Sequence, residues 1–170
     1  MTFQNPAKTP KNRLIRTAMA IDLENAARTW RPTETDAATL HRQLSTLFPA
    51  QAHFTVVAVN PRNALAGQRL VELTKGALRC RHGENGADLE LFDYLKEIPE
   101  NNRRHPQCPI TSVRLVSGDG IFIPAIRQLR QSNVYVTVIG HRNCLHHGIY
   151  RVADRVIILD DQTPQTQAAA

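Results

Sequence analysis

Apolar runs alternate with amphipathic segments along most of this chain. The runs are short, and few polar residues interrupt them, which is typical of strands buried on both faces of a parallel sheet. They predict strands at residues 18–23, 54–59, 113–116 and 134–139, with weaker ones at 77–81 and 155–159. The pattern therefore predicts a sheet whose strands are separated by other elements.

The segments between these runs show helical spacing. In residues 35–47, for example, Ala37, Leu40 and Leu44 recur at three- and four-residue intervals. Further helices are predicted at residues 61–74, 87–98, 122–130 and 145–152, and a loop rich in proline and charge at 99–109. This alternation predicts the α/β class: a single domain with a mostly parallel central sheet flanked by helices on both faces.

One unit of this pattern, at residues 112–140, presents a carboxylate. A buried strand leads into a turn in which Asp119 lies between two glycines, and a helix and a second strand follow. Asp119 should therefore lie at the carboxyl end of a strand. In open α/β sheets this edge, near the switch in strand order, is where ligands bind.

Two more acids should lie at the same edge, because right-handed crossovers bring all strand ends together there. Asp22 ends the first strand, and Asp88 begins the helix after the third. Converging carboxylates repel unless a cation or a shared proton compensates them. Oxygen ligands select hard ions, so we expect Mg²⁺ or Mn²⁺, which activate water and stabilise charge in phosphoryl transfer.

Each acid also has a purely structural interpretation. Asp119 would cap the following helix, Asp22 would be a turn residue at a strand end, and Asp88 would be favoured by the helix dipole. For Asp22, an acid after six mainly apolar positions is costly unless it is exposed or bound, which favours the functional interpretation. For Asp119, the neighbouring motifs described below favour it.

The charge balance indicates a polyanionic partner. The chain has 21 Lys and Arg against 15 Asp and Glu, a net charge of +6 and a pI near 9.7. Such an excess favours nucleic acids through phosphate contacts, although a basic surface also simply keeps a protein in solution. The arginines predicted to contact RNA are Arg28, Arg103, Arg104, Arg127 and Arg142. The single tryptophan, Trp30, is next to Arg31 and is a candidate for stacking one base.

The ends and the cysteines add expectations about location. No run approaches the roughly 20 apolar residues of a membrane helix, and the N-terminus lacks the apolar core of a secretory signal, so we expect a cytoplasmic protein without membrane contact.

Residues 1–13 should form a flexible basic arm and residues 161–170 a disordered tail, with the folded domain at 14–160. The three widely spaced cysteines should be free thiols. A homodimer or a protein partner stays open.

Four motifs occur in order along the chain. They are AIDLEN at 20–25, GADLEL at 86–91, SGDGIFIPAIRQLRQ at 117–131 with VYVTVIG at 134–140, and ADRVIIL at 153–159. Together they resemble the ordered motifs of the NYN family of PIN-like ribonuclease domains, and their order makes this resemblance more specific than any single motif. It implies a compact Rossmann-like α/β nuclease fold over roughly residues 14–160, whose acidic cluster binds Mg²⁺ or Mn²⁺ and cleaves RNA.

The resemblance also implies roles for particular residues. Asp22, Asp88 and Asp119 match the family's acids and become the predicted metal ligands and catalytic residues. Asn25 would orient a ligand or the first acid, and Ser117 would support the acid of the turn or contact phosphate.

The chain departs from the family pattern at Ile121, where many members have a second acid. The site would then hold a single metal, recruit Asp154 or Glu24 in support, or be catalytically weak. The sequence therefore predicts a metal-dependent ribonuclease, expected to be an endoribonuclease. Two alternatives stay open: a catalytically weak or inactive RNA-binding or regulatory module on the same fold, and a metal-dependent phosphohydrolase.

Overall fold

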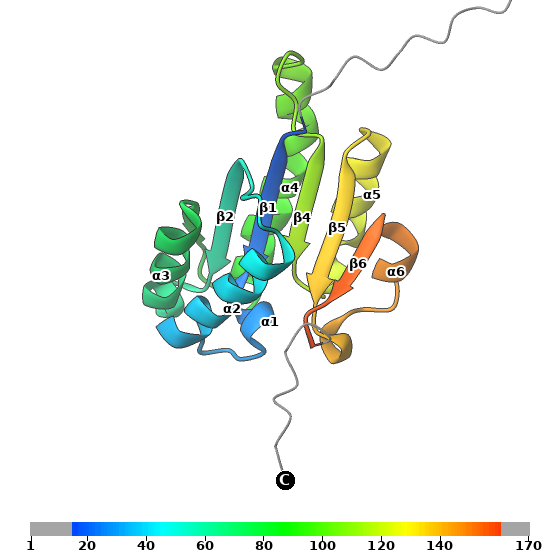
Figure 1. Cartoon of the computed structure of the whole chain (residues 1–170). Helices are drawn as coiled ribbons and strands as arrows, with labels where there is room; N and C mark the ends of the chain where they lie inside the picture. Colours follow the sequence, from blue (N-terminus) through cyan, green and yellow to red (C-terminus); the bar gives the residue numbers. More distant parts are fainter. Residues whose placement is uncertain (1–14, 161–170) are drawn as a thin grey trace, which may run out of the picture.

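The computed structural model describes residues 15–160, so the predicted arm at 1–13 and the tail at 161–170 lie outside the described residues. Within this range, six parallel strands form one sheet in the order β3-β2-β1-β4-β5-β6 (Figure 1). The predicted α/β class is confirmed.

The strands coincide with the apolar runs. They are β1 (Thr17–Asp22), β2 (Phe54–Val59), β3 (Ala77–Cys80), β4 (Ser112–Val116), β5 (Tyr135–Gly140) and β6 (Arg155–Ile158). Successive side chains of a strand point to opposite faces, and in β1 Ala20 joins one buried apolar cluster while Ile21 joins the other. Because both faces are covered, the central strands need apolar residues at nearly every position.

Helices cover the two faces of the sheet. They are α1 (Leu23–Ala27), α2 (Glu34–Leu47), α3 (Ala64–Thr74), α4 (Gly86–Arg104), α5 (Ile123–Gln131) and α6 (Ile149–Val152), with short 3₁₀ turns η1 (Pro61–Asn63), η2 (Gly120–Phe122) and η3 (Arg142–Cys144). The first three helices pack against one face and the last three against the other (Figure 1). None of the described helices is both long and apolar enough to cross a membrane.

The helix α4 is longer than predicted, because it continues through Pro99 into the segment expected to be a loop. Pro99 is buried against the core, and Glu100 forms ion pairs with Arg103 and Arg104 in the next turn. Burial and these pairs offset the backbone hydrogen bond that proline cannot donate.

The predicted helices differ from the structure in two other places. The short helix α1 directly after β1 was not predicted, and the helix expected at 145–152 is helical only from Ile149. The preceding residues are held in a non-helical path, since the His146 N–H donates to the carbonyl oxygen of Gly118 at 2.8 Å.

The strand order fixes where a site can form. The chain builds the sheet outward from β1 in one direction and then outward from β4 in the other, so β1 and β4 are neighbours at the switch point. The labelled strand arrows all point to the lower edge of the sheet in Figure 1. The loops after β1, β2 and β4 meet there, in the position where ligands bind to such sheets.

Candidate functional site

Asp22 is the last residue of β1 and also the N-cap of α1. Its Oδ1 accepts a hydrogen bond from the Asn25 N–H at 3.1 Å, and its Oδ2 accepts one from the Ser117 hydroxyl at 3.2 Å. Only 3% of the residue is exposed. The fold therefore buries this carboxylate and supplies it with hydrogen bonds from two uncharged donors.

The same two neighbours tie the end of β1 to the turn after β4. The Asn25 Oδ1 accepts from the Gly118 N–H at 3.0 Å, and the Ser117 Oγ accepts from the Asp119 N–H at 3.3 Å. Ser117 thus contacts two of the predicted acids at once. These hydrogen bonds fix the relative position of the two strand ends.

Asp119 stands at the start of η2, where its Oδ1 accepts from the Ile121 N–H at 2.9 Å. The turn before it requires glycine, because a Cβ on Gly118 would lie 2.2 Å from the carbonyl oxygen of Cys144. The Asp119 side chain is exposed. Ile121, in contrast, packs against the core, so its side chain is not directed to the same place.

Asp88 lies in the first turn of α4. The helix can begin close to the end of β3 because its first residue is glycine: a Cβ on Gly86 would lie 2.0 Å from the carbonyl oxygen of Arg81. This close approach directs Asp88, which is partly buried, toward the carboxyl edge of the sheet beside Asp22.

These acids perturb one another. Burial, followed by the negative charge of Asp88, raises the pKa of Asp22 well above its usual value of 3.8. Burial also raises the pKa of Asp88, to which the charges of Asp119 and Glu24 contribute. The Asp22 and Asp88 carboxyl groups are near enough to share a hydrogen bond when one is protonated. A compensating cation would favour the fully ionised pair.

A fourth carboxylate, Glu24, completes what we call the acid cluster: Asp22, Glu24, Asp88 and Asp119. Its Oε1 accepts from the Asn60 N–H at 2.7 Å and from the Asn63 Nδ2 at 2.6 Å. Asn60 and Asn63 were not predicted to belong to the site. Asn60 directly follows β2, so the strand-end rule that selected Asp22 could have selected it.

The acid cluster lines an open cleft of about 280 Å³. Trp30 and Arg62 also line it. Arg62, in the turn after β2, was not predicted, because the convergence of acids at strand ends gives no signal for the cations beside them. The cleft combines carboxylates with one aromatic and one basic side chain.

Comparison with known proteins identifies the family. The model of the NYN domain matches residues 16–160. The chain belongs to the NYN domain family. This confirms the resemblance seen in the four motifs, and NYN domains have a PIN-like nuclease fold, act on RNA and typically use divalent metal ions.

A solved structure has the same fold as this NYN domain. It is the crystal structure of a Vibrio parahaemolyticus protein of unknown function, with a TM-score of 0.62, 17% identity, and coverage of 91% of this chain and 98% of that one. At this identity the likeness concerns the fold alone. Among curated proteins, none matches the chain.

The donors in the cleft fit a hard divalent cation by their chemistry. Within residues 15–160, no three acidic, histidine or cysteine side chains stand close enough together to hold a metal ion as they are. Mg²⁺, however, keeps several water ligands and is often held by only one or two carboxylates together with substrate phosphates. The close pair of Asp22 and Asp88, both with raised pKa values, matches this requirement.

Asp154 does not join the acid cluster, which corrects the suggestion that it supports the site. It precedes β6 and so lies at the amino edge of the parallel sheet, opposite the cleft. Its carboxylate accepts from the Val136 N–H at 2.8 Å and from the Arg130 Nε at 2.8 Å. Asp154 therefore anchors the beginning of β5.

Two predicted RNA-binding arginines are also far from the cleft. Arg103 and Arg104 end α4, at the upper edge in Figure 1, where they pair with Glu100. They are 15 and 16 residues after Asp88, and a helix rises 1.5 Å per residue, so about 22–24 Å along the helix axis separates them from the acid. Arg127 is exposed on α5 and is not among the residues that line the cleft.

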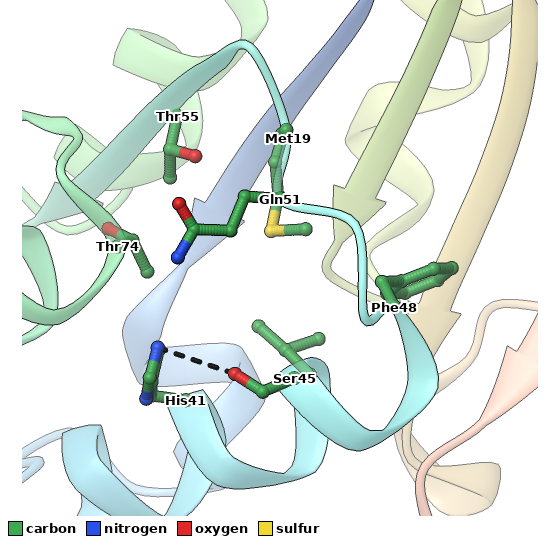
Figure 2. A pocket seen from close by; sticks show the side chains of 9 residues that line it. Met19, His41, Ser45, Phe48, Gln51, Thr55 and Thr74 are labelled. Atoms are coloured by element: carbon green, nitrogen blue, oxygen red, sulfur yellow. Dashed lines mark hydrogen bonds between the residues drawn. The ribbon is translucent and has the colours of Figure 1, made fainter.

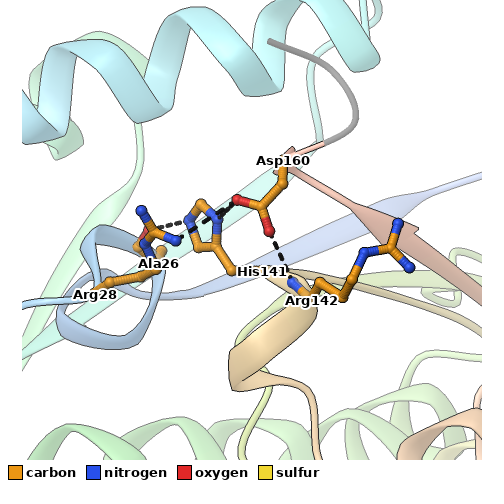
Figure 3. Close-up of polar contacts among 5 residues, drawn as sticks. All are labelled: Ala26, Arg28, His141, Arg142 and Asp160. Atoms are coloured by element: carbon orange, nitrogen blue, oxygen red, sulfur yellow. Dashed lines mark hydrogen bonds and ion pairs between the residues drawn. The ribbon is translucent and has the colours of Figure 1, made fainter.

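The remaining two, Arg28 and Arg142, lie at the carboxyl edge around Asp160 (Figure 3). The Asp160 carboxylate accepts from the Arg142 N–H at 2.9 Å and lies 2.6 Å from Nδ1 of His141, while Arg28 Nη1 is 3.8 Å away. The His141 Nε2 lies 2.9 Å from the carbonyl oxygen of Ala26. We call Arg28, His141, Arg142 and Asp160 the Asp160 cluster.

A second pocket has no comparable chemistry. It lies between α2 and the neighbouring strands and holds about 30 Å³, room for roughly one or two water molecules. Figure 2 shows Met19, Phe48 and Thr55 in its lining and a contact of 3.4 Å between Ser45 Oγ and His41 Nε2. No carboxylate lines it.

Proposed function

We propose that this NYN domain is a metal-dependent endoribonuclease that hydrolyses RNA phosphodiester bonds. Asp22, Asp88 and Asp119 are the proposed metal ligands and catalytic carboxylates. The observation that carries the proposal is the convergence of the acid cluster on one cleft, where burial and the repulsion of neighbouring carboxylates raise the pKa of Asp22 and Asp88. A cation bound between them would compensate this repulsion.

A bound Mg²⁺ or Mn²⁺ would supply two functions, activation of a water molecule and neutralisation of the charge that develops on the phosphate. The protein's own contribution is positioning. Ser117 and Asn25 fix both oxygens of Asp22, and the amides of Asn60 and Asn63 fix Glu24. Held in this way, the carboxylates need little rearrangement when a cation and substrate enter.

The direct test is cleavage of an internally labelled RNA by the purified protein with Mn²⁺, with Mg²⁺ and with EDTA. The Asp119→Asn variant is assayed beside the wild type, because it keeps the cap on the Ile121 N–H while removing the charge. We expect internal cuts that need metal and disappear in the variant. An undiminished rate in the variant would sink the assignment and indicate a contaminating ribonuclease.

One observation favours a second candidate, a catalytically weak RNA-binding module on the same fold. Ile121 stands where many family members have an acid, and its side chain packs against the core. This alternative predicts RNA binding without metal-stimulated cleavage in the same assay.

A further inference from the structure

Trp30 and Arg62 form a feature at the cleft that metal chemistry does not use. Trp30 lies in the segment between α1 and α2, and 59% of it is exposed. A single exposed tryptophan needs no explanation by itself. This one, however, lines the same cleft as the acid cluster.

The backbone of Trp30 is tied to the acid cluster. Its carbonyl oxygen accepts a hydrogen bond at 3.0 Å from the Nδ2 of Asn63, the same amide nitrogen that donates to Glu24. Asn63 is buried, with 6% of it exposed. One buried side chain therefore fixes both a carboxylate of the cleft and the segment that carries the ring.

Two guanidinium groups accompany the ring. The Cζ of Arg31 lies 4.1 Å from the ring centroid and that of Arg62 lies 5.2 Å from it. An exposed cation–π contact is weak and changes the equilibrium constant for its formation by only about twofold to fivefold. Stacking of one nucleic-acid base on an aromatic ring strengthens binding by about 5- to 150-fold. A base can therefore displace a guanidinium from the ring, which frees that cation to pair with a phosphate.

We infer that Trp30 is a stacking platform for one unpaired base of the substrate, and that Arg62 binds an adjacent phosphate; this inference rests on the proposed ribonuclease function. Both faces of a base are occupied inside a duplex, so the platform selects single-stranded RNA. It sets which part of an RNA enters the cleft and does not take part in the hydrolysis.

The test uses the fluorescence of Trp30 itself, since it is the only tryptophan in the chain. The full chain carrying Asp119→Asn, which blocks cleavage under the proposal, is titrated with a short single-stranded RNA in Mg²⁺ and again in EDTA. A duplex of the same sequence and an RNA with abasic sites serve as comparison probes. We expect the single strand to quench the fluorescence, and the duplex and the abasic RNA to quench much less.

The affinity of each variant for single-stranded RNA is then measured in a binding assay with labelled RNA. Trp30→Ala should weaken single-strand binding at least fivefold, Trp30→Phe should retain most of it, and Arg62→Ala should weaken binding in a salt-dependent way. Tyr135→Ala is the matched control, because this tyrosine is a similarly exposed aromatic residue at the opposite edge of the sheet, and it should bind normally. Equal binding of single strand by Trp30→Ala and the parent, or no binding of any RNA, would overturn the inference.

The two proposals fail separately. Metal-dependent cleavage with unchanged affinity in Trp30→Ala leaves the ribonuclease intact and removes the platform. Quenching by single-stranded RNA without metal-dependent cleavage by the wild type leaves the platform and removes the nuclease.

Discussion

Two charged clusters lie at the same edge of the sheet and differ in how their charges are compensated. In the Asp160 cluster, the hydrogen bonds from His141 and Arg142, in that order of importance, lower the pKa of Asp160 below its usual value. In the acid cluster, burial and neighbouring carboxylates raise the pKa of Asp22 and Asp88. The charge of Asp160 is therefore compensated by its neighbours within the protein, whereas the ionised forms of Asp22 and Asp88 are disfavoured by theirs.

The difference suggests separate roles for the two clusters. The Asp160 cluster joins the ends of β5 and β6 to α1, since His141 reaches both Asp160 and the carbonyl oxygen of Ala26 (Figure 3). It contributes to the fold. In the acid cluster, burial and repulsion disfavour the ionised forms of Asp22 and Asp88 at a position where ligands bind, a combination that is typical of functional sites.

The largest expected effect separates the clusters by activity. Asp22→Asn should reduce RNA cleavage by more than about 100-fold, because even residues that only support a metal ligand are commonly worth 10–100-fold. Asp160→Asn, the matched change in the other cluster, should cleave at nearly the wild-type rate. Initial rates under identical metal conditions provide the measurement; equal loss in both variants would contradict the separation.

A smaller loss is expected from the hydroxyl that contacts two acids. Ser117→Ala removes one donor to Asp22 and the acceptor for the Asp119 N–H, and should lower the cleavage rate by about 10–100-fold. Ser45→Ala, in the small pocket of Figure 2, is the control and should leave the rate unchanged. A larger loss of cleavage rate in Ser45→Ala than in Ser117→Ala would contradict the assignment of the site to the acid cluster.

The sequence predicted much of this comparison. Buried strands allow few residue types, so the apolar runs predicted the sheet, and parallel topology then placed Asp22, Asp88 and Asp119 at one edge. The same rule, applied to residues after β2, would have found Arg62. Residues such as Asn63, whose partners are distant in sequence, gave no local signal. Their side chains are positioned by neighbours in space and not by neighbours in sequence. Asp154 was misplaced because it precedes its strand and does not follow it.

Stability should change in opposite directions in the two clusters. Without metal at neutral pH, Asp22→Asn should raise the free energy of unfolding, because it removes a buried charge that other carboxylates repel. Asp160→Asn should lower it by roughly 0.5–1 kcal/mol, the modest value expected for partly exposed charged contacts. Urea denaturation of both variants beside the wild type gives the comparison, and a destabilised Asp22→Asn protein would argue against repulsion.

The pH at which these differences disappear provides a finer test. The raised pKa of Asp22 means that its penalty is present at neutral pH and disappears as pH falls from the folded-state pKa toward 3.8, the usual value. The lowered pKa of Asp160 means that its contribution is present above 3.8 and is lost only below that value. The difference between wild type and Asp22→Asn should therefore close first on acidification. Closure in the opposite order, in urea titrations without metal, would contradict the assigned directions.

The central claim is that a divalent cation compensates the acid cluster, and thermal unfolding with and without metal tests it most directly. Mn²⁺ at about 100 times its dissociation constant should stabilise the wild type by about 2.7 kcal/mol, or roughly 5–10 °C in melting temperature relative to EDTA. Asp160→Asn should show the same shift and Asp22→Asn almost none. An equal shift in Asp22→Asn, or no shift in the wild type, would contradict the account.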